Sequence, residues 1–166
     1  MYRKTFVEVN IDSLKENVSN IIKKYNNYKY YIAMVKSNAY GHGYYIVNDL
    51  IESGINYFAV SSLEEALEIR KYNKDIPVLC VEPIELDCID IAIKNNITLT
   101  IVSYDYIKKL LNKTKSKFKI HINLSSLYSF QSISYLKTHF YSNYFSPTYF
   151  LLHHFLKIKL FYNNWQ

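Results

Sequence analysis

The sequence of 166 residues predicts an α/β protein, and three features of residues 1–122 support this class. Short segments rich in β-branched and aromatic residues recur along the chain. Stretches with apolar residues at helical spacing separate them, and most strand-like segments are almost continuously apolar, as buried parallel strands are. Because alternating strands and helices build parallel sheets covered by helices, we expect an open sheet or a portion of a (β/α)8 barrel.

Six segments are expected to form strands, and five helices are expected between them. The strand segments are 6–9, 30–35, 57–60, 78–81, 99–102 and 118–122. Each helix is indicated by apolar residues three and four positions apart, in groups around Val18, Leu50, Ala66, Ala92 and Leu110. In parallel sheets, functional residues gather at the carboxyl ends of the strands, which here carry Lys36, Ser61, Glu82 and Ser103.

Helix ends are marked by recognisable capping patterns. Ser13 with Glu16 and Ser62 with Glu65 fit the capping box, in which a hydroxyl accepts a backbone N–H and the glutamate reaches back to the capping residue. Gly54 follows the helix around Leu50 and is expected in the left-handed position that ends many helices.

Composition favours a soluble, cytoplasmic protein. The hydrophobic fraction of 49% is that of a globular chain. No run of about 18 apolar residues exists to span a membrane, and the first residues lack the apolar core of a secretory signal. The formal charge of +6 forms no basic stripe for nucleic acid. We expect no metal site, and we expect Cys80 and Cys88 to be reduced core residues.

Composition changes sharply at Asn123. From there to Gln166 the chain contains no Asp, Glu, Gly, Ala, Val or Arg, and it is rich in aromatic residues. Such a segment lacks the charged face and turn residues of ordinary helices and hairpins. We therefore expect residues 1–122 to be the folded part and residues 123–166 to be a tail foreign to the fold, such as a frameshifted or truncated continuation. The alternative is an aromatic helix packed on the first part.

A lysine ends the second strand-like segment, in AMVKSNAYGHG at 33–43. Burial of an amine lowers its pKa and makes it nucleophilic, which suits a lysine that holds pyridoxal phosphate as a Schiff base. Tyr40 offers a hydroxyl to the phosphate, and Gly41 and Gly43 allow close approach of the backbone. The competing interpretation is a strand-end lysine that extends into solvent before a glycine turn.

This segment closely resembles the signature of bacterial alanine racemases, and FVEVNIDSLKENV and YFAVSSLEEALEIRK resemble the same family. The resemblance covers roughly residues 3–122. It implies a partial (β/α)8 barrel of about five strands that binds pyridoxal 5′-phosphate. Lys36 would bind the cofactor and act as one of two bases, and Tyr40 would hydrogen-bond its phosphate. The activity implied is racemisation of L-alanine and D-alanine, which supplies D-alanine for peptidoglycan.

The sequence departs from the family at Asn123, where an aspartate-threonine-glycine-methionine segment is expected. The family's second base is a tyrosine from the carboxyl-terminal domain of the partner subunit, and this chain has no counterpart of that domain. We therefore expect the chain alone to be inactive and the family's homodimer interface to be largely absent. Two alternatives remain open, a non-catalytic pyridoxal-phosphate-binding protein and a racemase acting on serine.

Two histidines, His42 and His121, are further candidate site residues. His42 belongs to the signature and is expected to support the loop rather than to bind a metal. His121 alternates with apolar residues and is expected to face the barrel interior.

Overall fold

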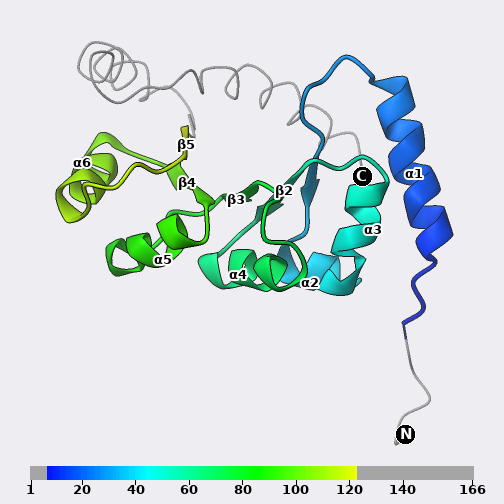
Figure 1. Cartoon of the computed structure of the whole chain (residues 1–166), viewed down its shortest axis with the longest axis horizontal. Coiled ribbons are helices and arrows are strands. Elements are labelled where there is room, and N and C mark those ends of the chain that lie inside the picture. Colours follow the sequence, from blue (N-terminus) through cyan, green and yellow to red (C-terminus); the bar gives the residue numbers. More distant parts are fainter. Residues whose placement is uncertain (1–6, 123–166) are drawn as a thin grey trace, which may run out of the picture. The chain divides into compact units, whose positions relative to one another are not determined.

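The computed structural model describes residues 7–122, in which strands and helices alternate (Figure 1). The five strands described are β1 (Ile32–Met34), β2 (Tyr57–Val60), β3 (Val78–Cys80), β4 (Ile97–Ile101) and β5 (Ile120–Ile122). They follow the order β1-β2-β3-β4-β5 in one sheet, and the β1–β2 and β4–β5 pairs are parallel. The predicted α/β class with five barrel strands is therefore confirmed.

The helices described are α1 (Ile11–Lys24), α2 (Lys36–Tyr40), α3 (Val47–Glu52), α4 (Leu63–Tyr72), α5 (Ile89–Lys94) and α6 (Tyr104–Lys113). Apolar spacing predicts all of them except α2, and α1 precedes β1 rather than lying between two strands. Single 3-10 turns, η1 (Tyr44–Ile46) and η2 (Leu86–Cys88), precede α3 and α5. The chain divides into two compact units between Val78 and Leu79, which we call unit 1 and unit 2.

Unit 1 is built around β2, whose four residues are all buried. Phe58 and Ala59 of β2 pair with Ala33 and Met34 of β1. Beyond β1, the ladder continues for one residue, since the Val35 N–H donates to the carbonyl oxygen of Ala59 over 2.9 Å. This bond extends the backbone pairing to Val35, the residue before Lys36.

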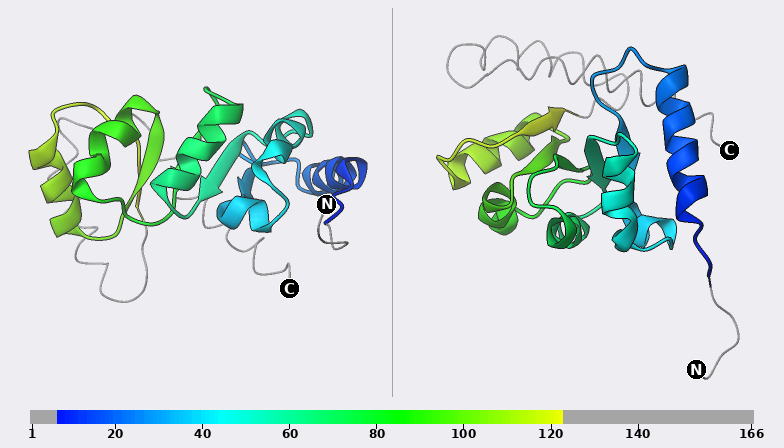
Figure 2. Two further views of the ribbon diagram at one scale, coloured as in Figure 1. Left: turned by 90° about the horizontal axis from the view of Figure 1, so that it is seen from below. Right: turned by 45° about the vertical axis from the view of Figure 1, so that its right-hand side comes forward.

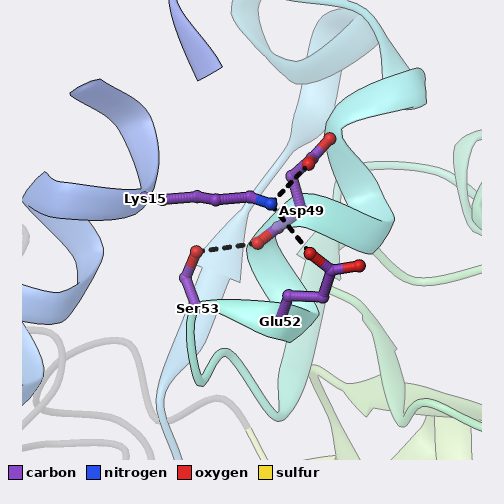
Figure 3. Close-up of polar contacts among 4 residues, drawn as sticks. All are labelled: Lys15, Asp49, Glu52 and Ser53. Atoms are coloured by element: carbon purple, nitrogen blue, oxygen red, sulfur yellow. Dashed lines mark hydrogen bonds and ion pairs between the residues drawn. The ribbon is translucent and has the colours of Figure 1, made fainter. Parts of the chain in front are cut away.

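Helices α1 and α3 lie side by side in unit 1 (Figures 1 and 2). The Lys15 ammonium of α1 lies 3.0 Å from Asp49 Oδ1 and 2.8 Å from Glu52 Oε2 of α3 (Figure 3). The hydrogen bond with Glu52, followed by that with Asp49, raises the pKa of Lys15 to about 12. The Ser53 hydroxyl donates to the carbonyl oxygen of Asp49 over 2.7 Å at the end of α3. Lys15 therefore joins the two helices electrostatically.

Unit 2 is built around β4, whose five residues are all buried, and α5 and α6 lie beside it (Figure 2). The Ser103 hydroxyl caps α6 by accepting from the Tyr106 N–H over 3.1 Å. The Tyr106 hydroxyl donates to the carbonyl oxygen of Ile84 over 2.7 Å, and burial raises the pKa of this phenol. These contacts join α6 to the loop after β3.

The strand expected at 6–9 is not formed where the structure describes it, since residues 7–10 have no regular secondary structure. Val7 is 79% exposed. Alternation of apolar and polar residues makes a strand only when another strand pairs with it, and among residues 7–122 the sheet contains only β1 to β5. The prediction for this segment was wrong because the pattern could not show the missing partner.

The first capping box was also wrong. Helix α1 begins at Ile11, and Asn10 is its cap, because the Asn10 Oδ1 accepts from the Ser13 N–H over 2.9 Å. Ser13 is therefore inside the first turn. Asparagine and serine are comparable caps, so the earlier of two candidates can start the helix.

Gly54 has the expected left-handed conformation, with φ of +106°. A Cβ there would lie 2.7 Å from Ile22 Cδ1, so glycine also permits close approach of α1. Cys80 is buried and Cys88 is half-buried, and no disulfide joins them. Within residues 7–122, no helix has the length and hydropathy needed to cross a bilayer. The predicted tail, 123–166, lies outside the described residues.

Candidate functional site: the Lys36 loop

Lys36 is the first residue of α2, separated from the end of β1 by Val35 alone, and it is half-buried. Its position at the carboxyl end of a parallel strand agrees with the sequence prediction. Within residues 7–122, its ammonium has no hydrogen-bonding or ion-pair partner. A half-buried amine with no partner among these residues is available to react with a carbonyl compound.

The residues after Lys36 form a turn of left-handed helix rather than the glycine turn that the sequence suggested. Ser37, Asn38, Ala39 and Tyr40 have φ between +52° and +54°. Each non-glycine residue in this conformation costs about 1–2 kcal/mol, and such residues normally occur singly. Four in succession mark strain, which accumulates at functional sites when surrounding contacts hold it in place.

The two glycines end this turn instead of offering donors to a ligand. Gly41 and Gly43 have φ of +89° and +90°. The Gly41 N–H donates to the carbonyl oxygens of Ser37 and Asn38, and the Gly43 N–H donates to that of Asn38 over 2.9 Å. Both N–H groups are therefore engaged within the loop, and close approach of this backbone to a phosphate stays a prediction.

Asn38 and Tyr44 hold the turn through two reciprocal hydrogen bonds. The Asn38 N–H donates to the Tyr44 hydroxyl over 3.2 Å, and the Tyr44 N–H donates to Asn38 Oδ1 over 3.1 Å. Burial raises the pKa of Tyr44, so its phenol stays neutral. His42 donates from Nδ1 to the carbonyl oxygen of Ala39 over 2.9 Å. This contact agrees with the predicted role of His42 as a support of the loop.

Glu65 joins the ends of β1 and β2. Its Oε1 accepts from the Ser37 N–H over 2.6 Å, and its Oε2 accepts from the Ser61 N–H over 2.8 Å. The Ser62 hydroxyl accepts from the Glu65 N–H over 3.4 Å, as the capping box requires. The second half of that box is different, because the carboxylate binds Ser37 and Ser61 rather than returning to Ser62.

The other predicted site residues are distributed over both units. Tyr40 ends the left-handed turn and is 48% exposed. The Ser61 N–H donates to Glu65, and the Ser103 hydroxyl caps α6. The carbonyl oxygen of Glu82 lies 3.3 Å from the thiol of Cys80. Half-buried His121 has its Nδ1 3.4 Å from Thr100 Oγ1 in unit 2. The structure therefore brings Lys36, Tyr40 and Ser61 into unit 1 and gives the others local structural contacts.

Sequence reasoning missed the roles of Asn38, Tyr44 and Glu65 around Lys36. A usable signal existed for Glu65, because parallel strands end at the same edge of a sheet. A carboxylate in the first turn after β2 is therefore close to the end of β1. No comparable signal existed for Asn38, whose role depends on the left-handed backbone.

The residues of the loop fit pyridoxal phosphate only in part. Lys36 supplies an amine with no partner among the described residues, and the exposed Tyr40 supplies a hydroxyl at the end of the same turn. The glycine N–H groups do not fit the phosphate, because they are engaged internally. The loop can thus hold an aldehyde covalently, while further phosphate contacts must come from elsewhere.

Comparison with known proteins identifies the family. The family described as alanine racemase, N-terminal domain, matches residues 9–127. Alanine racemase of Halalkalibacterium halodurans is 35% identical over 129 residues, which cover 75% of this chain and 33% of that protein. Alanine racemase 2 of Caldanaerobacter subterraneus is 36% identical over 128 residues, with the same coverage of 75% and 33%. The chain spans about a third of the length of these curated relatives.

Comparison with solved structures supports the same family. The crystal structure of alanine racemase from Bacillus anthracis with bound L-Ala-P has a TM-score of 0.69 at 32% identity, covering 75% of this chain and 33% of that chain. Alanine racemase from Oenococcus oeni has a TM-score of 0.69 at 30% identity, covering 84% and 43%. With most of its length matched in sequence and fold, the chain belongs to the alanine racemase family, of which it matches the N-terminal domain.

Proposed function

We propose that this chain carries the lysine-bearing part of a pyridoxal-phosphate-dependent alanine racemase, an isomerase. The observation that carries the proposal is Lys36, an amine with no partner among the described residues, at the carboxyl end of a half-buried parallel strand and followed by a strained turn. Membership of the alanine racemase family supports the same assignment.

In this proposal Lys36 binds the cofactor covalently through its ε-amine and moves a proton at the α-carbon of alanine. Tyr40 donates from its hydroxyl to the cofactor phosphate. When bound, pyridoxal phosphate supplies an electron-withdrawing ring that makes the α-proton of an amino acid acidic. The D-alanine formed would serve peptidoglycan synthesis.

Inversion requires a base on each face of the α-carbon, and we assign a base role to Lys36 alone. We therefore propose that residues 1–166 bind the cofactor without racemising alanine by themselves. Measurable conversion of L-alanine to D-alanine by the purified chain contradicts this. The cytoplasmic location and the family homodimer stay predictions.

Trapping with borohydride tests the role of Lys36. The full chain is incubated with pyridoxal 5′-phosphate, reduced with borohydride and digested, and labelled lysines are identified by mass spectrometry. We expect label at Lys36 at cofactor concentrations that leave Lys74, an exposed lysine in the turn before β3, unlabelled. Equal labelling of the two lysines in a folded sample contradicts the proposal.

Variants at the same two positions provide the controls. Lys36→Ala is expected to lose the absorbance of the bound cofactor, and Lys74→Ala is expected to retain it. Tyr40→Phe is expected to weaken cofactor binding by about tenfold, the value of one hydrogen bond to a charged group. Unchanged binding in Tyr40→Phe would remove Tyr40 from the phosphate site.

Two alternative functions also use Lys36 to bind the cofactor. A non-catalytic cofactor-binding protein is favoured if Lys36 is labelled and the α-proton of L-alanine does not exchange with deuterated water, because a single base suffices for that exchange. A different amino acid, such as serine, is the other candidate. A structure titled histidine racemase from Leuconostoc mesenteroides matches with a TM-score of 0.59 at 25% identity, so this fold is found with another named substrate. Assays with alanine, serine and histidine distinguish these substrates.

A further inference from the structure

We propose that Glu65 is a positioning residue for Lys36: its carboxylate ties the peptide after Lys36 to the peptide after Val60, and so fixes where the amine meets the cofactor. This inference rests on the proposed function of Lys36. It concerns a residue that the sequence indicated only as part of a helix cap.

The geometry uses both oxygens of the carboxylate. One oxygen accepts from the Ser37 N–H over 2.6 Å and the other from the Ser61 N–H over 2.8 Å. Hydrogen bonds from backbone N–H groups to a carboxylate are charge-assisted, and they are shorter and stronger than those between neutral groups. The two donors lie at the ends of neighbouring strands, because Met34 of β1 pairs with Ala59 of β2. Glu65 therefore spans the two strand ends.

Glu65 is itself held in place by the helix that carries it. Ser62 caps α4, and Leu63 and Ala66 on either side of Glu65 are buried. The Glu65 side chain is half-buried, and so is partly shielded from water. A carboxylate on a packed helix turn can resist movement of the loop, whereas one on a mobile segment cannot.

The bond to Ser37 lies where the strain of the loop begins. Ser37 is the first of the four residues with positive φ, and its N–H belongs to the peptide that joins it to Lys36. An acceptor fixed at this N–H sets the orientation of that peptide and thus of the Lys36 backbone. Without it, the left-handed turn loses the contact nearest the lysine, and the turn can relax toward a less costly conformation.

The experiment compares three variants of the full chain. Glu65→Gln keeps the shape of the side chain but leaves one acceptor oxygen, so one of the two N–H groups loses its partner. Ser103→Ala removes the cap of α6 in unit 2 and leaves Glu65 and Ser62 in place, which controls for general loss of stability. Glu68→Gln makes the same charge change one turn later, where Glu68 forms an ion pair with Lys71 on the surface.

The first measurement is the rate at which pyridoxal 5′-phosphate and borohydride label Lys36. We expect Glu65→Gln to slow labelling by about tenfold or more, because small misplacement of a reacting group has effects of this size. Ser103→Ala and Glu68→Gln are expected to label at the unchanged rate. Equal rates in Glu65→Gln and Ser103→Ala overturn the inference.

The second measurement needs no cofactor. Amide hydrogen exchange of Ser37 and Ser61 is expected to accelerate in Glu65→Gln and to stay slow in Glu68→Gln. If the unchanged chain shows no labelling of Lys36, the proposed function fails, and the exchange result then decides on Glu65 by itself. Faster exchange in Glu65→Gln supports the tether, and unchanged exchange of both amides overturns it.

Discussion

Two connections from strand to helix differ sharply in this chain, although the sequence predicts both in the same way. After β4, Ser103 caps α6 with one hydrogen bond and no residue of the connection has positive φ. After β1, four residues form a left-handed turn that Glu65, Asn38 and Tyr44 hold. The first connection is the least costly way to begin a helix. The second stores strain, and it is the one that carries the candidate reactive lysine.

The difference shows where specific side chains are needed. An ordinary connection tolerates many sequences, because one capping side chain satisfies one of the free N–H groups of the first turn and water can satisfy the others. A left-handed turn of four non-glycine residues costs about 1–2 kcal/mol for each residue, so it persists only with compensating contacts. Substitutions in the Lys36 loop should therefore lower stability more than equivalent substitutions after β4.

The largest effect is expected for Gly43→Ala. Gly43 has φ of +90° and ψ of +141°, a region that is essentially limited to glycine, and its new Cβ would lie 2.5 Å from the ring of Tyr45. Because Tyr45 is exposed and its ring can move, most of the cost is backbone strain. We expect urea unfolding to show a loss of about 2–3 kcal/mol.

Gly41→Ala is the matched control. Gly41 has φ of +89°, but no atom lies within 4 Å of its added Cβ, and its ψ of −4° is closer to the left-handed helix. A loss of about 1 kcal/mol is expected. Equal losses for the two glycines would show that the conformation at Gly43 is not the decisive one.

The next effect is expected for Asn38→Ala. The substitution leaves the Tyr44 N–H without its acceptor and places alanine, which tolerates left-handed backbone less well than asparagine, in the turn. We expect a loss of about 1–2 kcal/mol in urea unfolding. Asn48→Ala, at an exposed position of α3, is the control and should change stability by less than about 0.5 kcal/mol. A similar loss in both variants would contradict the proposed importance of the turn.

Much of the fold could be predicted from the sequence, because hydrophobic periodicity depends on local spacing. The apolar runs at 57–60 and 78–81 led directly to β2 and β3, and the helical spacing around Leu110 led to α6. The segment at 6–9 failed since alternation cannot reveal whether another strand pairs with it. The apolar pattern alone does not show which strands pair when they are distant in the sequence.

The site was predictable only in part, for a different physical reason. Lys36 and Tyr40 could be proposed from a motif, because their positions after the strand are local. The left-handed turn could not, since Ser37, Asn38 and Ala39 each prefer other conformations. The capping box at Ser62 and Glu65 is only half correct, and this concealed the role of Glu65. The Glu65 N–H donates to the Ser62 hydroxyl as predicted, but the Glu65 carboxylate accepts from the Ser37 and Ser61 N–H groups.

A smaller effect is expected at the ordinary connection. Ser103→Ala removes the acceptor for the Tyr106 N–H at the start of α6. We expect a loss of about 1 kcal/mol, typical of one helix cap, in the free energy of unfolding. Ser103→Asp keeps an acceptor at this position and should retain most of that stability. A loss in Ser103→Ala as large as that in Gly43→Ala would remove the contrast between the two connections.

The smallest effect is expected for the ion pairs that join α1 to α3, because all three side chains reach solvent (Figure 3). Hydrogen bonds with Glu52 and Asp49 raise the pKa of Lys15 from 10.5 to about 12. A raised folded-state pKa means that this contribution is complete below pH 10.5 and disappears as the pH rises through about 12. The stability difference between the unchanged chain and Lys15→Met should therefore be small and constant near neutral pH, and it should vanish between these two values. Tyrosine ionisation affects both proteins equally, so the difference isolates Lys15.

Since solvent-exposed pairs are screened by salt, added sodium chloride should reduce the same difference at pH 7. A difference that persists unchanged above pH 12 would show that Lys15 acts through packing of its apolar stem rather than through its charge.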